Sequence, residues 1–119
     1  MRFMTKMILG AGAAAGLACA SVPKPTEQVG QSEGAMRSAR ELGAEQVPPA
    51  ALELQLATEE LAKATQLMKD DQNEEATQMA NRARADAELA IAMTLRHQAN
   101  ADARSAEEQL KSVQDPKAQ

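Results

Sequence analysis

Apolar residues recur at alternating spacings of three and four in the middle of the chain, which is the spacing of an amphipathic helix. The stripe consists of Leu54, Ala57, Leu61, Ala64 and Met68. Val47-Pro48-Pro49 breaks the chain before it. Pro49 suits the first turn of a helix, because the backbone nitrogen has no helical partner there. The pattern therefore predicts a helix that begins near Pro49 and presents one apolar face.

A shorter helix is predicted upstream, from about Thr26 to Leu42. Thr26 is expected to cap its first turn, and Gly43 follows its last residue, where glycine commonly ends a helix. Gly30 and Gly34 lie inside the helix and cost it about 1 kcal/mol each. Because they are four residues apart, they share a face and are expected to let another helix approach closely.

The third predicted helix is the longest element of the chain. Asp70-Asp71-Gln72-Asn73 forms the turn before it, and either Asp71 or Asn73 is expected to cap it. The helix covers residues 74–114, because neither Pro nor Gly interrupts this segment, and Asp115-Pro116 ends it. At about 1.5 Å per residue it is about 60 Å long.

Two stripes of mostly small residues run along this third helix. One stripe comprises Ala76, Ala80, Ala83, Ala87, Ala90, Thr94, His97 and Ala101. The other comprises Ala85, Leu89, Ala92, Arg96, Ala99, Ala103, Ala106, Leu110 and Val113. At about 100° per residue the stripes lie roughly 160° apart, on nearly opposite faces of the helix.

One alanine face is expected to hold the second helix in an antiparallel hairpin across the short turn. The second helix is about half as long as the third, so the segment from Arg96 onward has no sufficiently long partner within the chain, unless the first helix folds onto it. Either a partner helix or a second copy packs on this segment, or it is a frayed, solvated helix; the sequence leaves both open. The predicted fold is all-α, with a short N-terminal helix and then a helical hairpin with a long third helix, partly coiled-coil-like.

The first 18 residues have the three parts of a secretory signal peptide. Arg2 and Lys6 supply positive charge, and an apolar region rich in Ala and Gly runs from Met7 to Leu17 before small residues follow. The apolar run is shorter than the roughly 20 residues that cross a bilayer. A permanent transmembrane anchor is therefore not expected.

Cys19 is the single cysteine of the chain and directly follows this apolar region. Gly16-Leu17-Ala18-Cys19 resembles the lipobox of bacterial lipoproteins, although Gly16 stands where Leu is usual. We expect lipidation of Cys19 after removal of residues 1–18, with residues 19–25 as the lipidated cysteine and a tether. The alternative is cleavage at Ala18-Cys19-Ala20 by the ordinary signal peptidase, which would leave a soluble periplasmic chain. By resemblance to lipoprotein sorting signals, a neutral residue after the cysteine points to the outer membrane.

Loss of the signal changes the charge of the chain. Arg2 and Lys6 leave with it, so 11 of the 13 basic residues remain with all 17 acidic ones, a net charge of −6. That charge argues against nucleic acid as a partner, since nucleic acid requires a basic face. Phe3 is the single aromatic residue and lies in the signal, so the remaining chain has no aromatic side chain to stack on a base or a sugar.

No catalytic, cofactor-binding or metal-binding residue is predicted. His97 is the single histidine, and its helical neighbours three and four residues away carry no charge that would orient an imidazole as a base. An activated nucleophile needs such a base, so the protein is not expected to be an enzyme. Asp70-Asp71-Gln72-Asn73 lacks the alternating ligands and the central glycine of a calcium loop, and is expected to be a turn.

Five segments carry a resemblance to a known family. They are Glu41-Leu42-Gly43-Ala44, Pro48-Pro49-Ala50-Ala51-Leu52-Glu53-Leu54, Leu61-Ala62-Lys63-Ala64, Asn73-Glu74-Glu75-Ala76 and Arg84-Ala85-Asp86-Ala87-Glu88-Leu89-Ala90. The chain resembles the bacterial envelope lipoprotein family known as domain of unknown function 4398 over most of residues 20–110. The resemblance implies a small helical module without assigned catalytic residues, which in that family sometimes precedes a peptidoglycan-binding domain.

These observations favour a lipid-anchored, periplasm-facing helical module, a non-catalytic envelope interaction protein. Its helical domain spans residues 26–115 and its C-terminal tail residues 116–119. Its expected contacts are the membrane, through the N-terminal lipid, and a protein partner or a second copy, through the third helix. The alternative is a structural alanine-zipper outer-membrane lipoprotein that forms homo-oligomers, for which the Ala-rich third helix is the motive.

Overall fold

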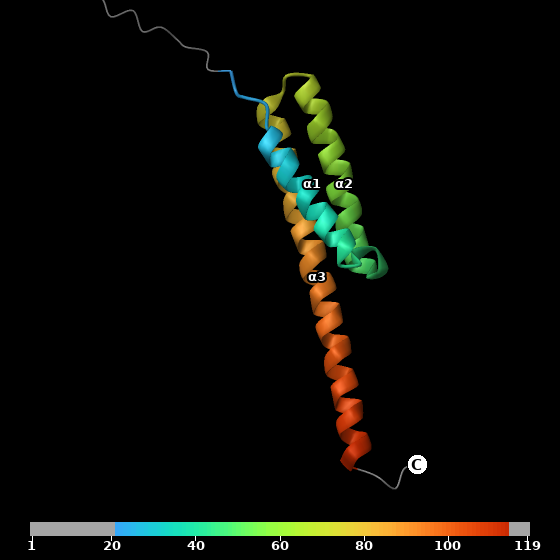
Figure 1. Cartoon of the computed structure of the whole chain (residues 1–119). Coiled ribbons are helices and arrows are strands. Elements are labelled where there is room, and N and C mark those ends of the chain that lie inside the picture. Colours follow the sequence, from blue (N-terminus) through green and yellow to red (C-terminus); the bar gives the residue numbers. More distant parts are fainter. Residues whose placement is uncertain (1–20, 115–119) are drawn as a thin grey trace, which may run out of the picture.

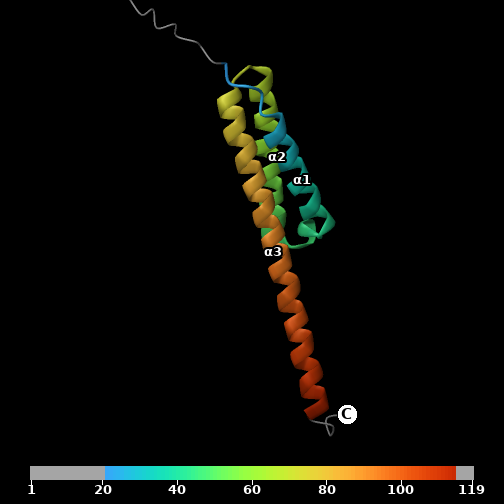
Figure 2. The same ribbon diagram turned by 60° about the vertical axis from the view of Figure 1, so that its left-hand side comes forward.

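The computed structural model describes residues 21–114, which fold into three helices and a short 3-10 turn. Helix α1 spans Thr26–Glu41, η1 spans Ala44–Gln46, α2 spans Pro48–Lys69 and α3 spans Asn73–Gln114. Figures 1 and 2 show α1 and α2 side by side along the N-terminal half of α3, whose C-terminal half continues beyond them. No strand occurs between residues 21 and 114. The predicted all-α fold with a long third helix is confirmed.

Helix α1 begins and ends where the sequence indicates, but its first turn is capped differently. Thr26 is already helical and makes no side-chain cap, so the predicted cap is wrong. Pro25 occupies the cap position, and its carbonyl oxygen accepts a hydrogen bond from the Val29 N–H at 3.1 Å. At the other end Gly43 has φ +87°, and its N–H donates to the carbonyl oxygen of Arg40 at 2.9 Å. Glycine adopts this left-handed conformation without steric cost, which confirms the predicted helix end.

Helix α2 begins at Pro48, with both prolines in its first turn. Val47 before them is extended (φ −108°, ψ 104°), as the residue before a proline prefers to be. After α2, the chain reverses through Asp71, whose φ of 57° is left-handed, and α3 begins at Asn73. Asn73 is therefore inside α3, and its side-chain oxygen accepts no hydrogen bond. Gln72, and neither Asp71 nor Asn73, directly precedes the first helical residue, so the expected cap by Asn73 is wrong and Asp71 stands one residue too early. The expected end of α3 at Asp115-Pro116 lies outside the described residues.

The core of the bundle consists mainly of alanine. Its buried apolar residues are Met36, Ala39, Ala44, Val47, Ala50, Leu54, Ala57, Ala64, Ala76, Ala80, Ala83, Ala87 and Ala90. Alanine side chains let helix axes approach closely, but each one removes little apolar area from water. The bundle therefore depends on close contact between helices more than on large buried side chains.

The alanine face of α3 that lies against α2 also lies against α1. Its buried residues are Ala76, Ala80, Ala83, Ala87, Ala90 and Thr94. Helix α3 packs on both of the other helices, and α2 runs antiparallel to it as the hairpin prediction requires. The burial stops at Thr94, because His97 and Ala101 at the end of the predicted stripe are exposed.

The glycines inside α1 do not serve a close approach between helices. A Cβ atom added to Gly30 or Gly34 would meet no other atom within 4 Å. The face that they share points away from the bundle, so the predicted helix contact over these glycines is wrong.

Candidate functional site

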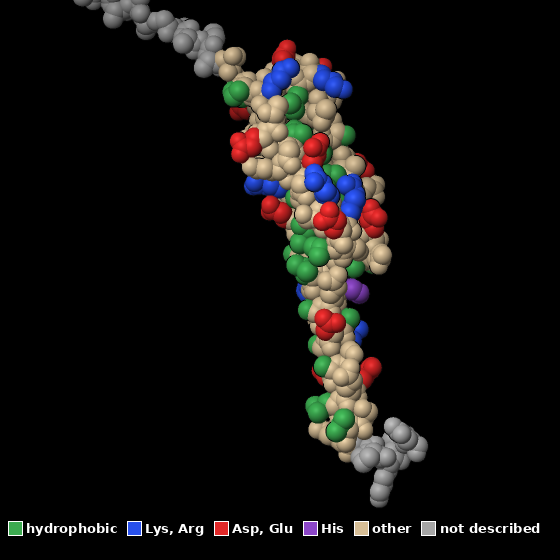
Figure 3. All heavy atoms as spheres, in the orientation of Figure 1, with side chains coloured by type: hydrophobic (Ala, Val, Ile, Leu, Met, Phe, Trp, Pro, Cys, Tyr) green, Lys and Arg blue, Asp and Glu red, His purple; other side chains and the backbone are tan. Residues whose placement is uncertain are grey.

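The C-terminal half of α3 continues beyond the ends of α1 and α2, and only its first residues lie near the bundle. Every residue of the extension, Leu95 to Gln114, is exposed. Helix α1 does not fold onto it but lies beside α2 on the N-terminal half. Gln98 ties the start of the extension to the bundle, since its side-chain N–H donates to the Leu42 carbonyl oxygen at 3.0 Å. Figure 3 shows the extension as a single helix projecting from the bundle.

The face of α3 that carries the bundle changes character where the bundle stops. Continued beyond Thr94 with the same alternation of three and four, it reads His97, Ala101, Arg104, Glu108 and Lys111. Four of these five side chains are polar. This face is therefore apolar only along the segment that α1 and α2 cover.

The opposite face of α3 stays mostly apolar to the end of the helix, and we call it the exposed seam. Its members are Ala85, Leu89, Ala92, Arg96, Ala99, Ala103, Ala106, Leu110 and Val113. All nine are exposed, including the three that lie level with the bundle. Its largest apolar side chains are Leu89, Leu110 and Val113, which are 43%, 58% and 77% exposed. Leu89 lies level with the bundle, Leu110 and Val113 lie near the end of the extension, and alanines and Arg96 stand between them.

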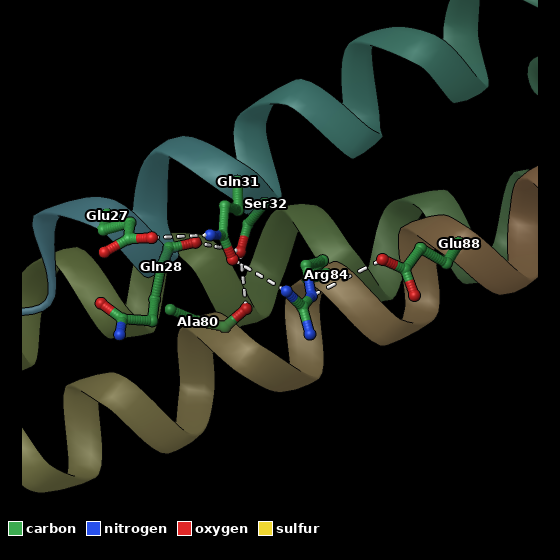
Figure 4. Close-up of polar contacts among 7 residues, drawn as sticks. All are labelled: Glu27, Gln28, Gln31, Ser32, Ala80, Arg84 and Glu88. Atoms are coloured by element: carbon green, nitrogen blue, oxygen red, sulfur yellow. Dashed lines mark hydrogen bonds and ion pairs between the residues drawn. The ribbon is translucent and has the colours of Figure 1, made fainter.

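A polar contact fixes α1 on α3 near the start of the bundle (Figure 4). The buried hydroxyl oxygen of Ser32 lies 2.6 Å from the Ala80 carbonyl oxygen on α3 and 2.8 Å from the Gln28 carbonyl oxygen on its own helix. The hydroxyl has one proton, so it donates to one of the two carbonyls at a time. Beside it, Arg84 donates to the Gln31 side-chain oxygen at 2.8 Å. These contacts fix the position of α1 along the axis of α3. The alanine face alone does not fix this position, because it is uniform along its length.

The Glu60 carboxyl lies between α2 and α3, where partial burial disfavours its charged form. Glu60 is 21% exposed in its side chain, and one of its oxygens is buried without a hydrogen-bond partner. Burial raises the pKa of the Glu60 carboxyl, and the neighbouring Asp86 carboxyl raises it further. Arg82, with its Nε 3.6 Å from a Glu60 oxygen, lowers that pKa but does not cancel the rise.

Residues 21–25 lie against the turn between α2 and α3, at the end of the bundle away from the extension (Figure 1). The Asn73 side-chain N–H donates to the Val22 carbonyl oxygen at 2.8 Å, and Lys24 Nζ lies 3.6 Å from an Asp71 carboxylate oxygen. The expected tether has no regular secondary structure here, but it is docked on the bundle from Val22 onward. No local pattern in the sequence indicates this contact, because its partners are about fifty residues apart.

The predicted lipidation residue, Cys19, lies outside the described residues, as do the signal segment and the C-terminal tail. His97 is exposed, and it lines a cleft of about 120 Å³ at the open end of the bundle. The remaining residues around this cleft are Val47, Pro49, Met93, Arg96 and Asn100. Over residues 21–114, no three His, Cys, Asp or Glu side chains gather in a way that would hold a metal ion. None of the helices described here combines the length and the hydropathy needed to span a bilayer.

Ser32 and Glu60 both lie at contacts between helices, and the sequence alone does not indicate their roles. A serine or glutamate within an otherwise helical pattern carries no local sign that a second helix lies over it. Their roles become apparent only when the positions of the helices relative to one another are known.

The family comparison covers both the bundle and part of the extension. A family model described as Domain of unknown function (DUF4398) matches residues 27–106. The matched segment contains α1, α2 and α3 as far as Ala106 in the exposed seam. No curated protein and no solved structure matches the chain.

Proposed function

The chain belongs to the DUF4398 family, and we propose that it is a non-catalytic helical module of the bacterial cell envelope. In this proposal the chain is anchored by lipid at Cys19, faces the periplasm from the outer membrane, and binds a protein partner through α3. The observation that carries the proposal is the exposed seam. It is a continuous, mostly apolar helix face that the rest of the described chain leaves uncovered.

The position of residues 21–25 supports an anchor at the N-terminal side. These residues sit at one end of the bundle, and the extension of α3 leaves from the other end (Figure 1). A lipid on Cys19 would therefore hold the bundle by one end and leave the seam free for a partner. Each buried CH₂ of an acyl chain contributes about 0.8 kcal/mol, so several chains together hold a protein on a membrane almost irreversibly.

Fatty-acid labelling tests the anchor. Wild-type chain grown with a labelled fatty acid should carry the label and sediment with membranes, and Cys19→Ala should lose the label and enter the soluble fraction. Ser21→Ala is the matched control, because it alters a neighbouring small residue and leaves the thiol intact. Equal absence of label in wild type and Cys19→Ala would refute the lipid anchor.

A second candidate function is the structural alanine zipper, in which homo-oligomers reinforce the envelope. Five alanines among the nine positions of the exposed seam favour it. The other alanine face of α3 is occupied by α1 and α2, so a zipper would have only the seam available. Sedimentation equilibrium of the chain tests this candidate, because a monomer at the highest attainable concentration excludes the zipper and leaves the partner-binding module.

A further inference from the structure

The exposed seam has the spacing of a coiled coil along its whole length. Its positions follow one another in steps of four and three from Ala85 to Val113, and α3 continues unbroken across them. Building on the interaction role proposed above, we propose that the seam packs against the same seam of a second copy of this chain, with the two α3 helices antiparallel.

The bundle leaves room for a second helix on this side of α3. Helices α1 and α2 cover the face that ends at Thr94, about 160° around the helix from the seam. Figure 2 shows one side of α3 uncovered along the bundle. Ala85, Leu89 and Ala92 are exposed there. A second helix can therefore lie along the seam from the end of the extension to the back of the bundle without displacing α1 or α2.

The antiparallel register that is centred near Ala101 places every large apolar side chain of the seam opposite an apolar one. The facing pairs, one residue from each copy, are Leu89 with Val113, Ala92 with Leu110, Arg96 with Ala106, and Ala99 with Ala103. Large side chains at both ends meet, and alanines at the centre let the two helices approach closely. Leu89, Leu110 and Val113 would all lose their solvent contact in this arrangement.

Charge decides the direction of the second helix. In a parallel, in-register pair the two Arg96 side chains would face each other within the seam, and Asp102 of one copy would lie beside Glu107 of the other. In the antiparallel pair, Arg96 comes level with residues 102–107 of the second copy, where Asp102 and Glu107 flank the seam. The two Asp102 carboxylates meet near the centre, but each has an Arg96 of the other copy within about one turn. The antiparallel pair therefore brings each Arg96 beside acidic residues of the other copy, whereas the parallel pair brings together only like charges at these positions, and this difference favours the antiparallel direction.

A matched pair of substitutions tests the surface. Ala103→Glu puts a charge into the seam, and Ala101→Glu makes the same change two residues away on the opposite face. Both residues are exposed and lie beyond the bundle, so neither change disturbs the core. In sedimentation equilibrium of the full chain, wild type and Ala101→Glu should form dimers and Ala103→Glu should be monomeric at the same concentration. A monomeric wild type, or a dimeric Ala103→Glu, would overturn the proposal.

Thiol crosslinking tests the direction. Leu89→Cys and Val113→Cys are made separately and then oxidised singly and as a mixture, with wild type run beside them to account for Cys19. The antiparallel pair predicts a crosslinked heterodimer in the mixture and little product from either variant alone, because like positions are then about 36 Å apart at 1.5 Å per residue. Strong crosslinking of each variant with itself, and none between the two, would establish a parallel pair and refute the antiparallel one.

In the antiparallel pair the two N-terminal segments lie at opposite ends, so both lipids reach one membrane only when the pair lies along it. Labelling tests the anchor and sedimentation tests the pair, so each can fail without the other. A chain that carries label at Cys19 but stays monomeric would refute the second copy and retain the anchored module. A chain that dimerises through the seam but takes up no fatty acid would do the reverse.

Discussion

The packing of α2 on α3 changes the pKa of the Glu60 side chain. Burial and the Asp86 carboxyl raise the pKa of Glu60 above its ordinary value of 4.5. The folded chain therefore binds this proton more tightly than the unfolded chain does. The contribution of Glu60 to stability is most favourable below pH 4.5, and it is lost as the pH rises through the raised pKa.

Glu60→Gln should consequently raise the melting temperature at pH 7, because glutamine is neutral and keeps the shape of the side chain. The gain should shrink as the pH falls toward 4.5, where Glu60 itself becomes neutral in the fold. Thermal unfolding by circular dichroism between pH 4 and pH 8 measures it, with the exposed Glu33→Gln as the control. A gain that is the same at both ends of this range would contradict the assignment.

The glycines of α1 give a second prediction at the scale of single residues. Gly30→Ala and Gly34→Ala should each stabilise the bundle by about 0.5–1 kcal/mol, because alanine favours the helix and its Cβ meets no other atom within 4 Å. Gly43→Ala should instead destabilise it by roughly 1–2 kcal/mol, since φ is +87° there. Urea unfolding measures all three. Destabilisation by the first two variants would mean that a partner approaches the outer face of α1.

At the scale of elements, α3 has two segments that differ in what stabilises the helix. Up to Thr94 it is held by α1 and α2, and beyond Thr94 every described residue is exposed. An isolated helical segment of about twenty residues is only marginally stable in water, so the extension gains its helix from continuity with the bundle and from any partner on the seam.

Removal of residues 101–119 should therefore leave the bundle folded. The melting temperature should change by no more than a few degrees in dilute solution, while the helical circular dichroism signal falls with the lost residues. A stop after Glu88 is the comparison, because it also removes the buried Ala90 and Thr94 and should unfold the bundle. A large loss of stability in the shorter cut would show that the extension packs on the bundle.

At the scale of the whole molecule, the two faces of α3 lie in different surroundings. The covered face carries small side chains, which let α1 and α2 pack closely on it, whereas the side chains of the seam are exposed to solvent. Substitution of alanine by leucine should therefore have opposite consequences on the two faces.

Ala83→Leu should destabilise the fold by about 1–3 kcal/mol, because the fully buried alanine leaves no room for three more carbons. Ala85→Leu, two residues away on the exposed seam, should change the stability of the monomer by less than about 0.5 kcal/mol. Ala92→Leu, which faces Leu110 of the second copy in the antiparallel register, should also strengthen association of the full chain by adding apolar area to the seam. Urea unfolding at low concentration and sedimentation at high concentration measure the two effects. Equal destabilisation by Ala83→Leu and Ala85→Leu would contradict the assignment of the two faces.

The sequence by itself determined the helices, their ends and the two faces of α3. Prolines at 48 and 49, Gly43 and the three-and-four spacing of alanines act locally, within one or two helical turns, so they can be recognised without a fold. The predicted caps Thr26 and Asn73 are wrong, because each is already the first residue of its helix. Pro25 stands at the cap position of α1, and the Asn73 amide donates to the docked segment 21–25.

Only the tertiary structure decided which face of α3 is covered, where the cover stops and what lies over it. Two alanine stripes are equivalent as sequence patterns, and their difference arises from the joint packing of α1 and α2 on one of them. The position of α1 along α3 depends on the contact between Ser32 and Ala80, which are 48 residues apart in the chain. The raised pKa of Glu60 depends on a carboxyl from the next helix. Such contacts join segments far apart in the chain, and their energies exist only when the helices are already in place.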